Sequence, residues 1–285
     1  MGIIVGIAAG AAATAAVSAT AIGIATVIGG ISVAGLIAGA IVSSVVTGAL
    51  AEEPSIGDLG STSSGILVNK SANDAPIPII YGVRKVGGTR VLMEITGDDN
   101  EFLHVVLALA EGEIDAVNYF WLNDVQYDDA KFAGLLDINT HLGSDTQTAD
   151  STLVSAVSGW TSSHQLKGTA YAYIKMKYDQ DAFASGLPTI TAEVRGVKVY
   201  DPRTTTTAWS DNPALCVRDY LTNTRYGRGI ETSLIDDTTF NAAANYCEEM
   251  VTIGGVSKER YTCNGVVDTS LGSMDVLKKL LTACR

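Results

Sequence analysis

The first 51 residues of this chain carry no charge, and this feature constrains its fold most. All 19 Lys and Arg and all 31 Asp and Glu lie from Glu52 onward, so the rest of the chain carries the whole formal net charge of −12. Met1–Ala51 is built mainly from Ala, Gly, Ile, Val, Ser and Thr. An apolar bilayer span needs about 20 residues, so there is room for two. We therefore predict an uncharged, apolar helical segment over residues 1–51.

Small residues recur in this segment at four-residue spacing, which lets helix backbones approach closely in an apolar medium. The glycines concerned are Gly2, Gly6, Gly10, Gly35 and Gly39, while Gly29 and Gly30 predict a turn between two helices. The segment has no Trp or Tyr belt and no flanking Lys or Arg, which argues against a permanent membrane resident. Two interpretations stay open: a bundle in which several copies bury these faces together, and a membrane-active segment that is released later.

The part after Glu52 predicts strands. Residues 52–74 are rich in Gly, Ser and Thr and predict a linker. Short alternating or apolar runs separated by turns then predict a β-barrel or sandwich domain over 75–128 and 168–201. The polar stretch 129–167 between them predicts an insertion carried on the barrel.

The region 202–285 predicts a second domain of mixed α/β character. Asn212 followed by Pro213 is typical of a helix start, and Asp236 predicts the cap of a second helix. A third helix is expected to begin near Ser273. The chain ends without a helix stop signal, so we expect the natural product to be longer and this domain to be truncated.

The residues that could carry chemistry form no convincing catalytic set. Adjacent carboxylates such as Asp98 and Asp99 fall in turns, where solvated side chains are expected. Asp179 and Asp181 resemble the start of a calcium loop but lack its Gly and its distant Glu. We therefore predict no catalytic residue, no cofactor and no metal.

Charge and cysteine usage narrow the class of protein further. No Lys/Arg cluster offers a grip on phosphates, which argues against sequence-specific nucleic-acid binding. The four cysteines, Cys216, Cys247, Cys263 and Cys284, are too widely spaced for a C-x-x-C motif. Buried thiols are favoured over disulfides if the protein folds in a cytoplasm.

Several sequence blocks in the C-terminal third, taken in order, resemble the J family of tail-tip, or host-specificity, proteins of lambda-type siphophages. The blocks include Tyr200–Arg203, Ala208–Cys216, Asp219–Leu221, Arg225–Gly227, Ala244–Cys247, Arg260–Asn264 and Met274–Leu277. Weaker matches upstream extend the resemblance over 72–285. The residues that carry it most specifically are Trp209, Asn212, Pro213, Cys216, Asp219, Arg225, Tyr226, Gly227, Cys247, Cys263 and Asn264.

The resemblance implies a structural virion protein. Its members are built from β-barrel hub domains similar to those of tail-tube proteins. It implies a central tail hub, a homotrimer that closes the distal end of the tail tube and supports host attachment and DNA ejection. The implied partners are the distal tail protein, other tail-tip proteins and the tape-measure protein, with assembly in the host cytoplasm. The competing hypotheses are a membrane-anchored secreted adhesin and a cell-wall hydrolase carried on a tail.

The uncharged segment generates a first prediction. If its glycine face packs closely and later enters the host inner membrane on ejection, the double change Gly6→Leu, Gly10→Leu should crowd that face without making it less apolar. Particles should assemble poorly, or assemble and deliver DNA poorly, as plaque counts and DNA-entry assays would measure. Normal infection by this variant would show that close packing is irrelevant. Normal ejection by particles that lack residues 2–50 would refute the membrane hypothesis.

Overall fold

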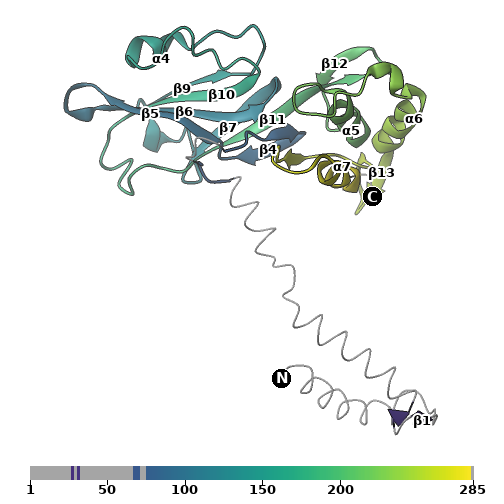
Figure 1. Ribbon diagram of the computed structural model, residues 1–285. Coiled ribbons are helices and arrows are strands. Elements are labelled where there is room, and N and C mark those ends of the chain that lie inside the picture. Colours follow the sequence, from purple (N-terminus) through teal and green to yellow (C-terminus); the bar gives the residue numbers. More distant parts are fainter. Residues whose placement is uncertain (1–26, 29–30, 33–66, 71–74, 284–285) are drawn as a thin grey trace. The chain divides into compact units, whose positions relative to one another are not determined.

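The computed structural model describes residues 27–28, 31–32, 67–70 and 75–283 (Figure 1). The chain divides into two compact units, Met1–Ser63 and Ser64–Arg285. In the first unit, the described residues form two short strands, β1 (Val27–Ile28) and β2 (Ile31–Ser32), paired antiparallel. These four residues are therefore strand, not helix. The remainder of the predicted helical segment lies outside the described residues, as do all seven of its glycines named above.

Two antiparallel sheets form the body of the second unit. The first has the strand order β5 (Thr89–Thr96), β6 (Phe102–Glu111), β10 (Thr169–Lys177) and β9 (Leu136–His141). The second has the order β12 (Thr206–Trp209), β11 (Ile190–Asp201), β7 (Ile114–Leu122) and β8 (Val125–Gln126), with β4 (Val83–Val86) also paired to β11.

The inner faces of the two sheets enclose the main apolar core. Leu107 and Ile174 of the first sheet and Phe120 and Val194 of the second belong to one buried cluster. The apolar run of β6 is buried at seven consecutive positions, because the opposite face of its sheet is covered as well. This explains why β6 lacks the alternation of a strand with one wet face. The predicted class, mainly β with helices towards the C-terminus, is confirmed.

The segment 129–167 differs from its prediction as an insertion on the barrel. It contains β9, which pairs with β10 from Tyr171↔His141 to Met176↔Leu136 and so belongs to the barrel sheet itself. The short helix α4 (Ser151–Ala156) lies over this sheet (Figure 1). Leu153 and Trp160 pack against Tyr171 and Tyr173 on the outer face of the sheet. The segment is therefore part of the barrel and its cover.

The described end of the predicted linker also belongs to the barrel. The Asn69 side chain donates to the Ile190 carbonyl and accepts from the Ile190 N–H, both at 2.8 Å. The Asn69 amide thus makes with Ile190 the two hydrogen bonds that the backbone of a neighbouring strand would make. Lys70 continues this attachment through a parallel bridge to Thr89. Asn69 and Lys70, within the linker expected over 52–74, are thus attached to the barrel.

A second core lies where three helices pack on the ends of β11 and β3 (Ile79–Tyr81). The helices are α5 (Pro213–Thr222), α6 (Asp237–Glu248) and α7 (Ser273–Thr282). Their starts agree with the prediction: Asn212 Oδ1 accepts from the Ala214 N–H at 3.0 Å, and Asp236 Oδ1 accepts from the Thr238 N–H at 3.1 Å. β3 pairs with β15 (Gly265–Val267), which ties the proline-rich segment before the barrel to the C-terminal region.

The remaining described elements are short, and one of them contributes Phe132 to the barrel core. β13 (Met250–Ile253) and β14 (Val256–Glu259) form a two-stranded ribbon, and three short 3-10 helices occupy turns: η1 (Asp98–Asn100), η2 (Ala130–Phe132) and η3 (Thr232–Leu234). In the described part of the chain, no helix is both long and apolar enough to span a membrane.

The long strand β11 passes from one core to the other at Gly196. Ala192 and Val194 belong to the barrel core, whereas Val197 and Val199 belong to the helical core. The Gly196 N–H donates to the Gly82 carbonyl at 2.7 Å. A Cβ at this position would lie 2.0 Å from the Ile80 carbonyl oxygen. The residue must therefore be glycine for β3 to cross β11 this closely.

We predict that Gly196→Ala lowers the free energy of unfolding by roughly 2–3 kcal/mol, since a backbone atom has to move to make room. The matched control is Gly159→Ala, where an added Cβ meets nothing within 4 Å. Urea unfolding followed by circular dichroism measures both. Equal stabilities for the two variants would contradict the crossing as described.

Candidate functional site

The residues that carry the family resemblance gather around one region, which we call the joint. It is formed by β3 and the end of β11 on the barrel side and by α5, α6 and the loops that follow them on the helical side. The joint has two polar clusters, one around Arg203 and one around Asp219, and a set of buried thiols.

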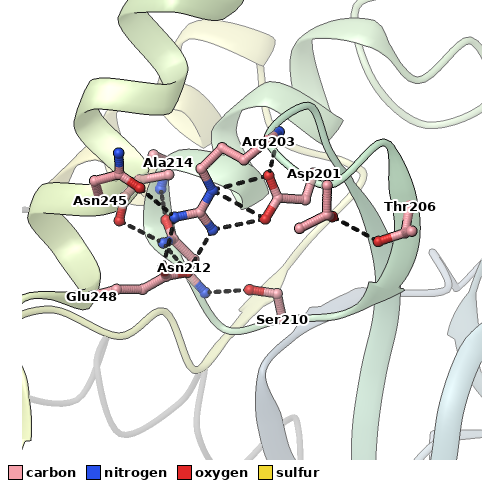
Figure 2. Close-up of polar contacts among 10 residues, drawn as sticks. Asp201, Arg203, Thr206, Ser210, Asn212, Ala214, Asn245 and Glu248 are labelled. Carbon is pink, nitrogen blue, oxygen red and sulfur yellow. Dashed lines mark hydrogen bonds and ion pairs between the residues drawn. The ribbon is translucent and has the colours of Figure 1, made fainter.

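Arg203 lies at the centre of the first cluster (Figure 2). Its Nε donates to Asp201 Oδ1 at 3.0 Å and its Nη2 to Asp201 Oδ2 at 2.7 Å. Its Nη1 and Nη2 also donate to the two Glu248 oxygens, at 2.6 and 2.7 Å. This double fork uses the planar guanidinium in a way that a lysine cannot reproduce. The loop after β11 is thereby attached to the end of α6.

Asn212 attaches the start of α5 to the same helix. Its Oδ1 caps α5, and its Nδ2 donates to the Ala244 carbonyl and to Glu248 Oε1, each at 2.9 Å. The side chain is almost fully buried, so each of these bonds replaces one to water. Pro213 follows at the first helical position, where its missing N–H costs nothing.

The charges of this cluster depend on one another. Hydrogen bonds from Arg203 hold the pKa values of Asp201 and Glu248 below their usual range, and the same bonds raise the pKa of Arg203. All three groups are therefore charged at neutral pH, with every strong donor of the fork engaged. Such a cluster can hold backbone segments in place, and its charged groups are engaged with one another.

Asp219 is the acceptor of the second cluster. Tyr81 Oη donates to its Oδ2 at 2.7 Å, and Tyr226 Oη donates to the same atom at 2.9 Å. Burial raises the pKa of Asp219, against the lowering effect of these two hydroxyls. Burial likewise raises the pKa values of Tyr81 and Tyr226, so both phenols remain protonated donors. One carboxylate thus joins β3, α5 and the loop after α5.

The loop after α5 contacts the barrel through Arg225 and Tyr226. Arg225 pairs with Glu111 at the end of β6, and its guanidinium occupies the space that a Cβ on Gly168 would need. The Tyr226 ring packs over Gly112, where a Cβ would lie 3.0 Å from the ring. Gly227 completes the turn, because a Cβ there would lie 2.2 Å from the Tyr220 carbonyl oxygen.

Trp209 and Asn264 hold the turn between β3 and β4. Trp209 Nε1 donates to the Gly82 carbonyl at 3.3 Å, and Asn264 Oδ1 accepts from the Val83 N–H at 2.8 Å. The Arg195 guanidinium lies 4.1 Å from the centre of the Trp209 ring. Trp209, which precedes α5, and Asn264, which precedes β15, therefore both attach to the turn between β3 and β4.

Three of the four cysteines line the helical core. Cys216, Cys247 and Cys263 are all buried, as predicted. Cys216 on α5 and Cys263 before β15 interact through their thiols, and this interaction together with burial raises the pKa of Cys216. Cys284 lies outside the described residues.

Two histidines outside the joint are held by polar contacts as well. His104 contacts the Thr96 and Tyr173 hydroxyls at 2.7 and 2.8 Å, and burial lowers its pKa. His141 Nε2 lies 2.9 Å from Asp150, whose other oxygen caps α4. Among the described residues, no three His, Cys, Asp or Glu side chains are grouped so that they could hold a metal ion.

The structure brings together all eleven residues named from the resemblance, but their main partners were missed from the sequence. Tyr81, Arg203 and Glu248 anchor the two polar clusters and were not singled out. Arg203 falls within the block Tyr200–Arg203, and Tyr81 lies in the region of the weaker upstream matches, so a signal existed for both. Glu248 follows one such block directly, and only the fold shows that it meets Arg203.

The chain is similar in sequence to components of phage tails. No family model matches it. The baseplate hub protein pb3 of Escherichia phage T5 is 27% identical over 54% of this chain and 23% of its own length. The tip attachment protein J of Escherichia phage SECphi27 is 27% identical over 39% of this chain and 11% of its own length. The chain thus spans less than a quarter of either relative. These relatives confirm the resemblance to J-type tail-tip and hub proteins.

Among solved structures, a chain from the virion of a native gene transfer agent particle has a TM-score of 0.42 and 16% identity, over 76% of this chain and 64% of that chain.

The first polar cluster yields a stability prediction. Arg203→Ala should lower the free energy of unfolding by roughly 2–3 kcal/mol at neutral pH, less than a fully buried pair because Glu248 is 38% exposed. Folded-state pKa values below the ordinary range near about 4 stabilise the fold above that pH, and the contribution is lost as the pH falls through them. The difference between wild type and variant should therefore shrink in acid.

Urea unfolding at about pH 7 and about pH 3 measures this difference. Lys278→Ala is the control, since its contact with Asp275 is 3.6 Å long and both side chains are exposed. The control should change stability by less than about 0.5 kcal/mol. An Arg203→Ala effect that stays constant with pH would show that the pairing contributes nothing.

Proposed function

We propose that this chain is a structural component of a phage tail tip, the hub portion that closes the distal end of the tail tube. The similarity to a baseplate hub protein and to a tip attachment protein carries the proposal. The joint supports it, because the polar residues described there are engaged in holding elements together. We propose no enzymatic activity.

The proposal includes a homotrimer whose neighbours are the distal tail protein, other tail-tip proteins and the tape-measure protein. The acidic composition of the chain favours a lumen wall that repels DNA and lets it slide, because like charges repel across a narrow channel. Rigid attachment of helices to the barrel suits a part that must keep its shape while neighbours bind on several sides. Residues 1–51 would serve as a lumen plug, as a membrane segment on ejection, or as both in succession.

Image reconstruction of intact particles tests the proposal. An epitope inserted after Gly134, an exposed turn with open space around it, marks the chain without touching the joint. We expect three marked copies around the axis at the distal end of the tail. A six-fold ring, a single copy, or label on the capsid or along the tail tube would contradict the hub proposal.

A further inference from the structure

The four-stranded sheet ends on an open apolar edge. β5 is its outermost strand, and in the described part of the chain only Thr89 and Arg90 at its start are bridged further, to Lys70. Met93 and Ile95 pair with Val105 and Leu103, and so face the side of the barrel core, yet they are 50% and 56% exposed. An open strand edge with apolar side chains is a template for pairing with another strand.

A groove of about 310 Å³ adjoins this edge. Its walls are predominantly apolar, and its principal lining side chains are Ile95, Leu103, Met176, Tyr178, Leu187 and Pro188. Tyr178 and Leu187 at its rim are 67% and 48% exposed. Apolar area of this kind is stabilised when a partner covers it.

The ribbon β13–β14 is the complementary feature on the same chain. Among the residues that the structure describes, its two strands pair only with each other, and an isolated two-stranded ribbon is marginal in water. Ile253 and Val256 flank the Gly254–Gly255 turn and are 56% and 64% exposed, and Met250 is 59% exposed. The ribbon thus presents an apolar tip and two free strand edges.

The ribbon and the groove belong to different parts of the second unit. β5 is the edge strand of the four-stranded barrel sheet, whereas β13 lies beside the helices, and the two are far apart in Figure 1. The ribbon of one copy therefore cannot cover the groove of the same copy. Charge does not oppose a meeting between copies: Asp98 and Asp99 precede the groove residue Asn100, so this end of the groove is acidic. The ribbon carries Lys258 and Glu259 on β14, whose charges balance, and it can approach without net repulsion.

We propose that the ribbon β13–β14 of one copy docks along the open edge of β5 in a second copy, with its tip in the apolar groove. The occupant is a second copy of this chain, because the chain itself carries both matching surfaces. A contact between two different surfaces repeats from copy to copy and generates a ring when the rotation closes. The inference rests on the proposed trimeric hub and names the contact that would build it.

Site-specific cross-linking tests the contact in the full chain. Copies with Ile95→Cys are mixed with copies with Ile253→Cys in mild detergent, and a short bis-maleimide, which adds one thiol at each end, is supplied. We expect cross-linked dimers in the mixture and not with either variant alone, which excludes a link within one copy. A chain with both changes should give bands up to a covalent trimer.

Leu234→Cys is the matched control for Ile253→Cys, because Leu234 is apolar and 75% exposed but lies outside the ribbon. Ile253→Asp should weaken association about 10- to 100-fold, the factor expected when a charge replaces one buried Ile side chain. Leu234→Asp should leave it unchanged. Since both side chains are exposed, both variants should keep the wild-type melting temperature.

Two results would overturn the inference: cross-linking no stronger than with Leu234→Cys, or full association by Ile253→Asp. The hub proposal is tested separately, by the number and position of the copies in the particle. If particles show three copies at the tail tip but the cross-link fails, another surface builds the ring. If the cross-link forms but the chain lies elsewhere in the particle, the contact stands and the hub proposal fails.

Discussion

Both apolar cores of the second unit depend on one continuous strand. β11 contributes Ile190 and Val194 to the barrel core and Val197 and Val199 to the helical core. Gly196 lies between the two sets, where the backbone of β3 crosses too closely for any side chain. Because a strand backbone is stiff and hydrogen-bonded on both sides, the helices cannot turn independently of the barrel. The two cores thus form one compact unit from Ser64 onward.

The polar clusters of the joint restrict the orientation of the helices relative to the barrel. Apolar contacts alone tolerate small rotations, whereas the double fork of Arg203 and the two hydroxyls on Asp219 are satisfied in a single arrangement. Burying such groups contributes little net stability compared with apolar replacements, while leaving one partner unpaired is costly. Their value in this fold therefore lies in fixing the orientation of α5 and α6 on the barrel. In the proposed hub, which would keep its shape while neighbours bind, that property would matter more than extra stability.

Much of the fold could be predicted because its signals are local. The apolar run of β6 and the cap formed by Asn212 before Pro213 act within a few residues. The sequence predicts an insertion where β9 lies, because Leu136–His141 is an edge strand with partly buried side chains and weak hydrophobic contrast. The contacts of Asn69 and of Arg203 with Glu248 join residues 121 and 45 positions apart, and no local pattern announces them. The resemblance found residues of the joint but not their distant partners.

The contrast between the joint and the surface indicates where function resides. Inside, the carboxylates of both polar clusters already have donors, so little reactive chemistry is left over. Outside, an open edge at β5 and an apolar ribbon at β13–β14 remain uncovered. On the proposal that these surfaces meet between copies, the angle between them sets how many copies close a ring. That angle is held by β11 and the joint, since β5 belongs to the barrel side and the ribbon follows α6 on the helical side. The rigidity of the joint would then determine the symmetry of the assembly, which links the buried charges of Arg203 and Asp219 to the architecture of the tail tip.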